Sequence, residues 1–369
     1  MSPNPATNFK LPAAQLSAIF EYLTEEGYQN IGPQLRDGAI MLEVMDSTSS
    51  LPTGVHESQG KGTYTLDQTT DNSYFQYTVG PQSFKKYLYP PRRKLWGATK
   101  DGGTFCVEEE VQKPPKMAFW GIRGCDIAAI KILDRIFLEG AYVNEWYQQA
   151  REDLFILAVG CTTPSANCFC TTSGAGPTPQ ENFDISLTEI IPGELFVMRC
   201  GSDKGAKLAT SLNLKKATKA DVAKDEELME AAAGKMPKRF DPQEAATLLK
   251  ENLEHLQWDD VAKRCLACAN CTMVCPTCFC SATEDVTDLT GDHSERWLRW
   301  DSCFNADFSY IHGGKIRHSI KSRYRQWMTH KLSSWYDQFG TSGCVGCGRC
   351  TTWCPVGIDL TEELLALKS

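Results

Sequence analysis

The sequence CLACANCTMVCP occupies residues 265–276, and CVGCGRCTTWCP occupies residues 344–355. Both stretches space four cysteines as Cys-x2-Cys-x2-Cys-x3-Cys-Pro, the spacing of bacterial ferredoxins that carry two 4Fe-4S clusters. Three thiolates three residues apart can wrap one cluster from a short loop, whereas the fourth points away and binds the other cluster. Two copies of this spacing in one chain therefore predict two neighbouring clusters.

This crossed pattern assigns four cysteines to each cluster. The first cluster takes Cys265, Cys268, Cys271 and Cys354, and the second takes Cys344, Cys347, Cys350 and Cys275. Crossed ligation requires the long insert between the two runs to loop out and return. A pair of structural zinc sites is the alternative, because zinc also accepts four thiolates, although zinc sites rarely use this spacing.

The two runs differ at the residues between their cysteines. Gly346 and Gly348 in the second run permit positive φ angles and let backbone N–H groups approach the cluster sulfurs. Such N–H groups raise the reduction potential of a cluster. The first run has Ala267 and Ala269 at the matching positions.

Charge and cysteine content narrow the class of protein. The chain has 46 Asp and Glu residues against 38 Lys and Arg residues, so we expect no nucleic-acid partner. No window approaches the roughly 18 apolar residues of a membrane-spanning helix, and the N-terminus resembles no secretion signal. Seventeen cysteines, mostly closely spaced, favour metal binding in a reducing compartment over disulfides. We therefore expect a cytoplasmic protein with no membrane contact.

The patterns predict an α+β protein in which an N-terminal α/β region precedes a two-cluster ferredoxin-like domain with a long insert. We place the N-terminal domain at residues 1–215, a linker or surface helical segment at 216–245 and the cluster domain at 246–369. Helices are predicted at Pro12–Glu25 and Asp126–Phe137 and from Pro242 onward, and strands at Ala39–Val44, Phe75–Val79, Met117–Trp120, Leu154–Val159 and Leu195–Met198.

A third cluster is predicted in the N-terminal region. Cys125 follows the strand Met117–Trp120, and Cys161 follows the strand Leu154–Val159, with Cys168 and Cys170 shortly after it. Parallel strands that end on one edge would bring these four thiols together, enough for one cluster. The alternative is that some of them are buried small apolar residues.

The remaining five cysteines have weaker interpretations. Cys106 and Cys200 stand alone, and we expect both to be ordinary packing residues. Cys278, Cys280 and Cys303 exceed the eight ligands of the two runs. They could shield the clusters or pack the insert, and a redox role is not favoured.

Several motifs together resemble one family, the beta subunits of cytoplasmic bidirectional NiFe hydrogenases (sulfhydrogenases), whose relatives include the corresponding iron-sulfur subunit of anaerobic sulfite reductase. Besides the two cysteine runs, the motifs are FKKYLYPP (84–91), GIRGCD (121–126), CTTPSANCFCTTSGAGP (161–177), PTCFC (276–280), WDSC (300–303) and RYRQWMTHK (323–331). Gly124 replaces an expected proline but leaves Cys125 in place.

The resemblance implies an electron-transfer subunit rather than a catalytic one. Its expected partners are a flavin subunit that meets NAD(P)H, together with the hydrogenase small subunit that lies beside the NiFe site and the NiFe large subunit. The alternatives are the corresponding subunit of an anaerobic sulfite reductase and a zinc-stabilised interaction module. No dinucleotide-binding or P-loop motif is visible, so flavin and nicotinamide are expected elsewhere in the complex.

A basic stretch at residues 315–331 is a candidate docking surface. It carries Arg323 and Arg325 on a predicted helix, with Tyr324 and Trp327 beside them. Such a charge run is usually a solvated face, but aromatic and arginine side chains also suit an interface. The hypothesis is that it docks an acidic partner or neutralises cluster charge.

Overall fold

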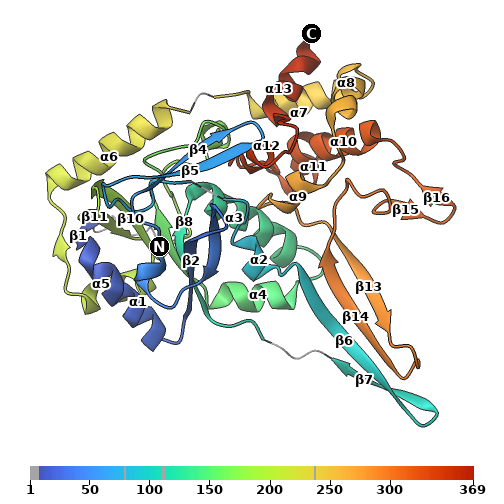
Figure 1. Cartoon of the computed structure of the whole chain (residues 1–369), viewed down its shortest axis with the longest axis horizontal. Coiled ribbons are helices and arrows are strands. Elements are labelled where there is room, and N and C mark those ends of the chain that lie inside the picture. The colour runs from blue at the N-terminus through green and yellow to red at the C-terminus, as the bar shows by residue number, and fades with distance from the viewer. Residues whose placement is uncertain (1–7, 79, 110–112, 237) are drawn as a thin grey trace.

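A mixed eight-stranded β-sheet forms the centre of the N-terminal half (Figure 1). The computed structural model describes residues 8–78, 80–109, 113–236 and 238–369. From edge to edge the strands are β12 (Lys215–Lys216), β1 (Asn8–Pro12), β11 (Leu195–Cys200), β10 (Ile185–Ile191), β9 (Phe155–Val159), β8 (Met117–Ile122), β2 (Gln29–Arg36) and β3 (Ala39–Val44). The four strands β10, β9, β8 and β2 are parallel, and the outer pairings are antiparallel.

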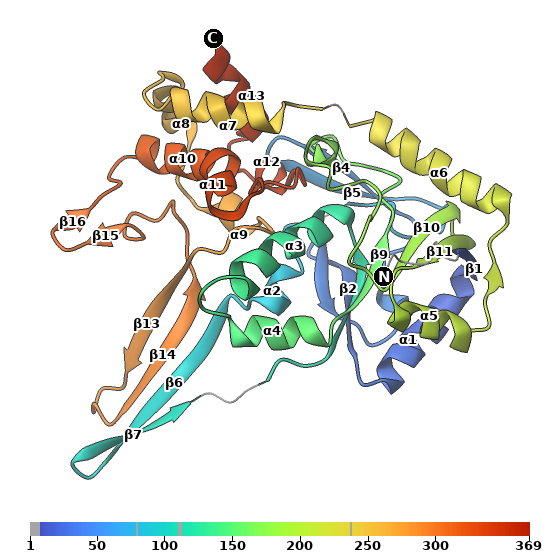
Figure 2. The ribbon, with the colours of Figure 1, turned by 180° about the vertical axis from the view of Figure 1, so that it is seen from behind.

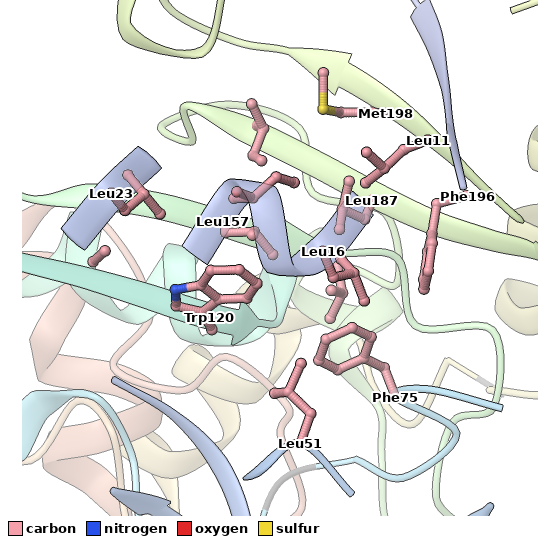
Figure 3. Close-up of a cluster of buried hydrophobic side chains, with 14 of the residues drawn as sticks. Leu11, Leu16, Leu23, Leu51, Phe75, Trp120, Leu157, Leu187, Phe196 and Met198 are labelled. Carbon is pink, nitrogen blue, oxygen red and sulfur yellow. The ribbon is translucent and has the colours of Figure 1, made fainter. Parts of the chain in front are cut away.

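Helices cover both faces of this sheet. The helices α1 (Leu16–Glu25) and α5 (Asp203–Ser211) share one core with the sheet, and α3 (Gly124–Leu138) and α4 (Glu145–Glu152) share the other. Figure 3 shows the first core, in which Trp120 of β8 lies under α1. The indole of Trp120 is fully buried, and its Nε1 donates to Asn30 Oδ1 at 2.8 Å. Central strands buried on both faces explain the unbroken apolar runs of β8 and β9.

Most predicted N-terminal elements are confirmed. The strands at Ala39–Val44, Met117–Trp120, Leu154–Val159 and Leu195–Met198 and the helix at Asp126–Phe137 match β3, β8, β9, β11 and α3. The helix predicted from Pro12 starts later, because β1 ends at Pro12 and a 3-10 turn, η1 (Ala13–Gln15), precedes α1.

The strand predicted at Phe75–Val79 is wrong over its described part. Phe75 has a φ of 54°, which breaks an extended strand. The carbonyls of Phe75 and Tyr77 instead accept hydrogen bonds from the buried guanidinium of Arg123. Val79 lies outside the described residues.

A four-stranded antiparallel sheet projects from the body as an arm (Figure 1). Its order is β13 (Ser281–Thr287), β14 (His293–Trp300), β6 (Arg92–Asp101) and β7 (Thr104–Glu109). The insert between the cysteine runs supplies β13 and β14, and β14 pairs with β6 from the N-terminal region. A separate hairpin of β4 (Val55–Gly60) and β5 (Thr63–Gln68) reaches the second cysteine run. There the ring centres of Tyr64 and Trp353 lie 5.0 Å apart. The predicted domain limits at residues 215 and 245 stay a prediction.

Short helices surround the cysteine runs in the C-terminal half. These are α7 (Pro242–Glu251), α8 (Gln257–Arg264), α9 (Asn270–Met273), α10 (Ile320–Thr329), a π-helical turn η4 (His330–Ser334), α11 (Trp335–Phe339), α12 (Arg349–Thr352), α13 (Leu360–Leu365) and η5 (Ala366–Lys368). The pair β15 (Tyr310–Ile311) and β16 (Gly314–Lys315) completes the insert, and the remaining short helices of the chain are α2 (Lys85–Leu88), η2 (Thr48–Ser50) and η3 (Cys170–Ser173). As predicted, Asp241 caps α7 ahead of its first-turn proline. In the described ranges no helix combines the length and apolarity needed to cross a membrane.

The helix α6 (Lys219–Gly234) joins the two halves (Figure 2). A capping box begins this helix. The Asp221 amide donates to Thr218 Oγ1, and the Thr218 amide donates to the Asp221 carboxylate. We expect Thr218→Ala to lower the free energy of unfolding by about 1 kcal/mol, because the Asp221 amide loses its acceptor. Urea unfolding measures this loss, with Lys219→Ala as the surface control. Equal urea midpoints of unfolding for Thr218→Ala and Lys219→Ala would contradict this prediction.

Candidate iron-sulfur sites

The first cysteine run lines a hollow in the C-terminal half. The helix α8 ends at Arg264, and the residues that follow place Cys265, Cys268 and, in α9, Cys271 around one hollow. Cys354 of the second run lines the same hollow. The four thiols predicted for the first cluster therefore surround one space, which Cys350 of the second predicted set also lines.

Apolar side chains form the rest of this hollow. Its wall includes Phe304, Tyr324, Trp327, Ile358 and Leu360, all of them buried. Burial raises the pKa of the Cys271 thiol well above its usual value, and the charges of Cys265 and Cys354 add to the effect. Cys268 is exposed, whereas Cys265, Cys271 and Cys354 are half-buried. The hollow is thus dry on most sides and meets solvent near Cys268.

Both runs use the same unusual backbone. Gly346 and Gly348 have φ angles of 66° and 75°, as predicted, and Ala267 and Ala269 have 51° and 67°. A left-handed alanine costs roughly 1–2 kcal/mol, so the first run carries strain that the second avoids. This geometry points the Ala267 amide at Cys265 Sγ, 3.3 Å away, and the Gly346 amide at Cys344.

The first three thiols of the second run lie close to Cys275 of the first run. These three are Cys344, Cys347 and Cys350. Burial raises the pKa of Cys344 to about 11, and the charge of Cys275 is one of the smaller causes. Cys347 and Cys350 are also close enough to Cys275 for its charge to raise their pKa values, after the larger effect of burial. The structure thus groups the four thiols that the sequence predicts for the second cluster.

Two buried lysines stand beside Cys275, and we did not identify either of them from the sequence. Lys331 Nζ donates to Cys275 Sγ at 3.2 Å. Lys85 Nζ donates to the carbonyls of Cys275 at 2.9 Å and Cys278 at 2.7 Å. Both lysines are only 3% exposed. The motifs FKKYLYPP and RYRQWMTHK contain these two lysines. The sequence does not distinguish a buried lysine from an exposed one, so it gave no signal of their role.

The N-terminal thiols also lie together. Cys125 is in the first turn of α3, Cys161 follows β9, Cys168 lies in the loop that precedes η3, and Cys170 is the first residue of η3. All four are buried, and burial is the largest cause that raises their pKa values. The charges of neighbouring thiols raise these pKa values further. The charge of Cys161 raises the pKa values of Cys168 and Cys170, and the charge of Cys170 raises that of Cys125. Because β8 and β9 are parallel, their carboxyl ends deliver these residues to one edge.

The N-terminal thiols pack directly against the second run. The Phe169 amide donates to the Gly346 carbonyl at 2.8 Å. A Cβ atom at Gly346 would stand 2.5 Å from the Phe169 carbonyl oxygen, so only glycine permits this approach. The charge of Cys347 raises the pKa of Cys125, behind the larger effects of burial and of Asp126. The three thiol groups therefore form one continuous series.

A buried ion pair joins the same two segments. Arg349 lies between Cys347 and Cys350, and its guanidinium donates to Asp126 Oδ2 at 2.9 Å. Both side chains are almost fully buried, at 2% and 3% exposed for Arg349 and Asp126. Arg349 also donates from Nε to the Gly80 carbonyl.

The other cysteines divide into isolated residues and pairs. Cys106 is exposed on β7, and Cys200 is half-buried at the end of β11. A hydrogen bond from Cys303 lowers the pKa of Cys280 to about 7. Cys278 in turn hydrogen bonds to Cys275 and lowers the pKa of that thiol. The extension of the first run therefore packs its extra sulfurs beside the predicted ligands.

The docking hypothesis for the basic stretch is wrong for Arg323, Tyr324 and Trp327, which are buried. Tyr324 and Trp327 are buried in the core beside the first run. Arg323 is buried and donates to the carbonyls of Arg317 and His318. Arg325 forms an ion pair with Glu254 at 2.8 Å. The helical period of α10 turns Arg323, Tyr324 and Trp327 inward, whereas Arg325 is half-buried and its partner Glu254 is exposed. The other half of the hypothesis, neutralisation of cluster charge, stays a prediction.

The donor sets fit iron-sulfur chemistry. Each of the three groups consists of four thiols, and none of the predicted ligands is an imidazole or a carboxylate. Thiolates are the ligands of 4Fe-4S clusters. Within the ranges that the structure describes, no three His, Cys, Asp or Glu side chains are placed to surround a single metal ion.

Comparisons with known proteins agree with this chemistry. Residues 264–358 match the family described as "4Fe-4S dicluster domain", which confirms the predicted two-cluster domain within an α+β chain. Sulfhydrogenase 2 subunit beta of Pyrococcus furiosus is 30% identical over 307 residues, which cover 82% of this chain and 88% of the relative. No solved structure matches significantly. The chain therefore belongs to the family of sulfhydrogenase beta subunits and is an iron-sulfur electron-transfer subunit.

Proposed function

We propose that the chain relays single electrons through three 4Fe-4S clusters between a flavin subunit that meets NAD(P)H and a NiFe hydrogenase module. The observation that carries this proposal is the continuous series of three four-thiol groups. The relative belongs by name to a sulfhydrogenase, which supports hydrogenase partners. The cytoplasm, where thiols stay reduced, is the proposed location.

The proposed ligands are the twelve cysteines of the three groups. They are Cys125, Cys161, Cys168 and Cys170; Cys275, Cys344, Cys347 and Cys350; and Cys265, Cys268, Cys271 and Cys354. Bound clusters would take up and release single electrons. The chain's own residues hold the clusters in order, and the aromatic wall of the first hollow limits contact with water.

One end of the series is suited to exchange electrons with a partner. Cys268 is exposed, and its neighbours Leu266 and Val356 in the wall of the hollow are 61% and 42% exposed. An apolar rim around an accessible ligand is a favourable contact for another protein of the complex. The N-terminal thiols, which are buried, would form the inner end of the relay.

Metal analysis tests the number of clusters. Chain purified without oxygen should contain about twelve iron and twelve sulfide ions, because each group of four cysteines holds four irons. We expect Cys125→Ala to lower the iron content to about eight per chain. The exposed Cys106→Ala variant is the control and should keep all the iron. A Cys125→Ala variant that also keeps all the iron would show that the third cluster does not exist. A chain that contains zinc and no sulfide would show that it is not an electron relay.

Purification of the intact complex tests the partners. Nickel and flavin in fixed ratio to this chain are the expected result. Sirohaem absorbance in place of nickel would instead assign the chain to a sulfite reductase and overturn the hydrogenase proposal.

A further inference from the structure

Lys331 is a buried cation held against a predicted cluster ligand. Its ammonium makes three hydrogen bonds: to Cys275 Sγ at 3.2 Å, to Thr277 Oγ1 at 3.0 Å and to the Gly343 carbonyl at 2.9 Å. These use all three of its N–H donors. The ammonium is therefore fixed in place, with one of its three bonds directed at sulfur.

The main chain around Lys331 is built to hold it there. Lys331 lies in the π-helical turn η4, between α10 and α11. Such single-turn π segments inside α-helices are frequently found at functional sites. The amide of Gly343, next to Cys344, donates to the Lys331 carbonyl at 2.9 Å. The backbone of Lys331 is thus bonded to the second run, and its side chain joins the first run to the second.

Lys85 adds a second positive charge behind the same ligand. Besides its two bonds to carbonyls of the Cys275–Cys278 segment, its Nζ lies 3.9 Å from the centre of the Trp300 ring. Among the described residues, no carboxylate forms an ion pair with Lys331 or Lys85. A buried charge without a counterion is costly, so the negative charge that balances these lysines must come from the thiolates and what they bind.

We infer that Lys331, supported by Lys85, sets the reduction potential of the cluster held by the second thiol group. This inference rests on the proposed ligand assignment. Reduction adds one electron, and hence one negative charge, to a cluster that already carries negative charge with its thiolates. A fixed ammonium in a poorly polarisable interior stabilises that added charge, and hydrogen bonds to the sulfurs act in the same direction. The second cluster would therefore accept its electron from a neighbouring cluster more readily than it would without Lys331.

Redox titration of the full chain, followed by electron paramagnetic resonance, tests the inference. The variants are Lys331→Met, which removes the charge at similar length, and Lys331→Arg, which keeps it. The control is Lys321→Met, which removes a lysine of α10 that pairs with Asp259 of α8. We expect Lys331→Met to shift one of the one-electron components to lower potential by at least 59 mV, which is a tenfold fall in its reduced-to-oxidised ratio. The other components of Lys331→Met should keep their reduction potentials. All components of Lys331→Arg and of the control should have reduction potentials near those of the wild type.

Iron content separates the possible failures. If Lys331→Met keeps its iron and all components keep their potentials, the inference is wrong. If Lys331→Met loses iron, Lys85→Met decides, because Lys85 contacts carbonyls and no sulfur: a lowered potential of one component supports the inference and an unchanged one overturns it. A wild-type chain with fewer than eight irons would instead contradict the proposed function, whatever the lysine variants do.

Discussion

Cys265→Ala combined with Cys354→Ala should leave about eight irons per chain, whereas Cys265→Ala combined with Cys275→Ala should leave about four. The first pair removes two ligands of one predicted cluster, and the second pair removes one ligand from each of two clusters. Since Cys265 and Cys275 belong to the same run and Cys354 to the other, uncrossed ligation would reverse the two results.

The structure supports the crossed outcome through the placement of the fourth cysteines. Cys354 lines the hollow of the first run, and Cys275 lies among the thiols of the second. Alanine is preferable to serine in these variants, because a serine oxygen could replace the lost sulfur as a ligand.

The single variants provide the controls. Each of Cys265→Ala, Cys275→Ala and Cys354→Ala should leave about eight irons when one cluster is lost. Iron and sulfide analysis of anaerobically purified chain gives the counts, and circular dichroism checks that the fold persists. Equal iron contents for the two double variants would contradict crossed ligation.

Arg349→Met should lower the free energy of unfolding by about 3–5 kcal/mol, because it leaves the buried carboxylate of Asp126 without a partner. The ion pair lies 2.9 Å apart with both side chains nearly inaccessible to solvent. It connects the second cysteine run to the first turn of α3.

A double variant tests the pair as a unit. Arg349→Met with Asp126→Leu should be more stable than Arg349→Met alone, because two apolar side chains leave no buried charge. Urea unfolding without oxygen measures all three proteins, with iron content determined in parallel. The exposed pair Lys224 and Glu227 offers a matched control, since Lys224→Met should change stability little. If Arg349→Met is as stable as this control, the pair does not hold the two parts together.

Spacing and periodicity predicted the local features of this protein. The cysteine runs, the positive φ angles at Gly346 and Gly348, and the strand-turn-helix unit around Cys125 all depend on residues close together in the chain. The prediction at Phe75 failed because its carbonyl bonds to Arg123, far along the sequence. The docking hypothesis failed for the same kind of reason: the core that covers Tyr324 and Trp327 is built from distant segments.

The sequence by itself determined that this chain carries clustered cysteine ligands and a mixed α/β region, because ligand spacing and hydrophobic periodicity are written in short stretches. Only the tertiary structure decided which charges stand beside those ligands. Lys85, Lys331 and Arg349 read as ordinary basic residues in the sequence, yet each is buried against a thiol-bearing segment. Their positions follow from long-range packing between the two halves, such as the pairing of β6 with β14 and the contact of Phe169 with Gly346, and no local pattern encodes such contacts.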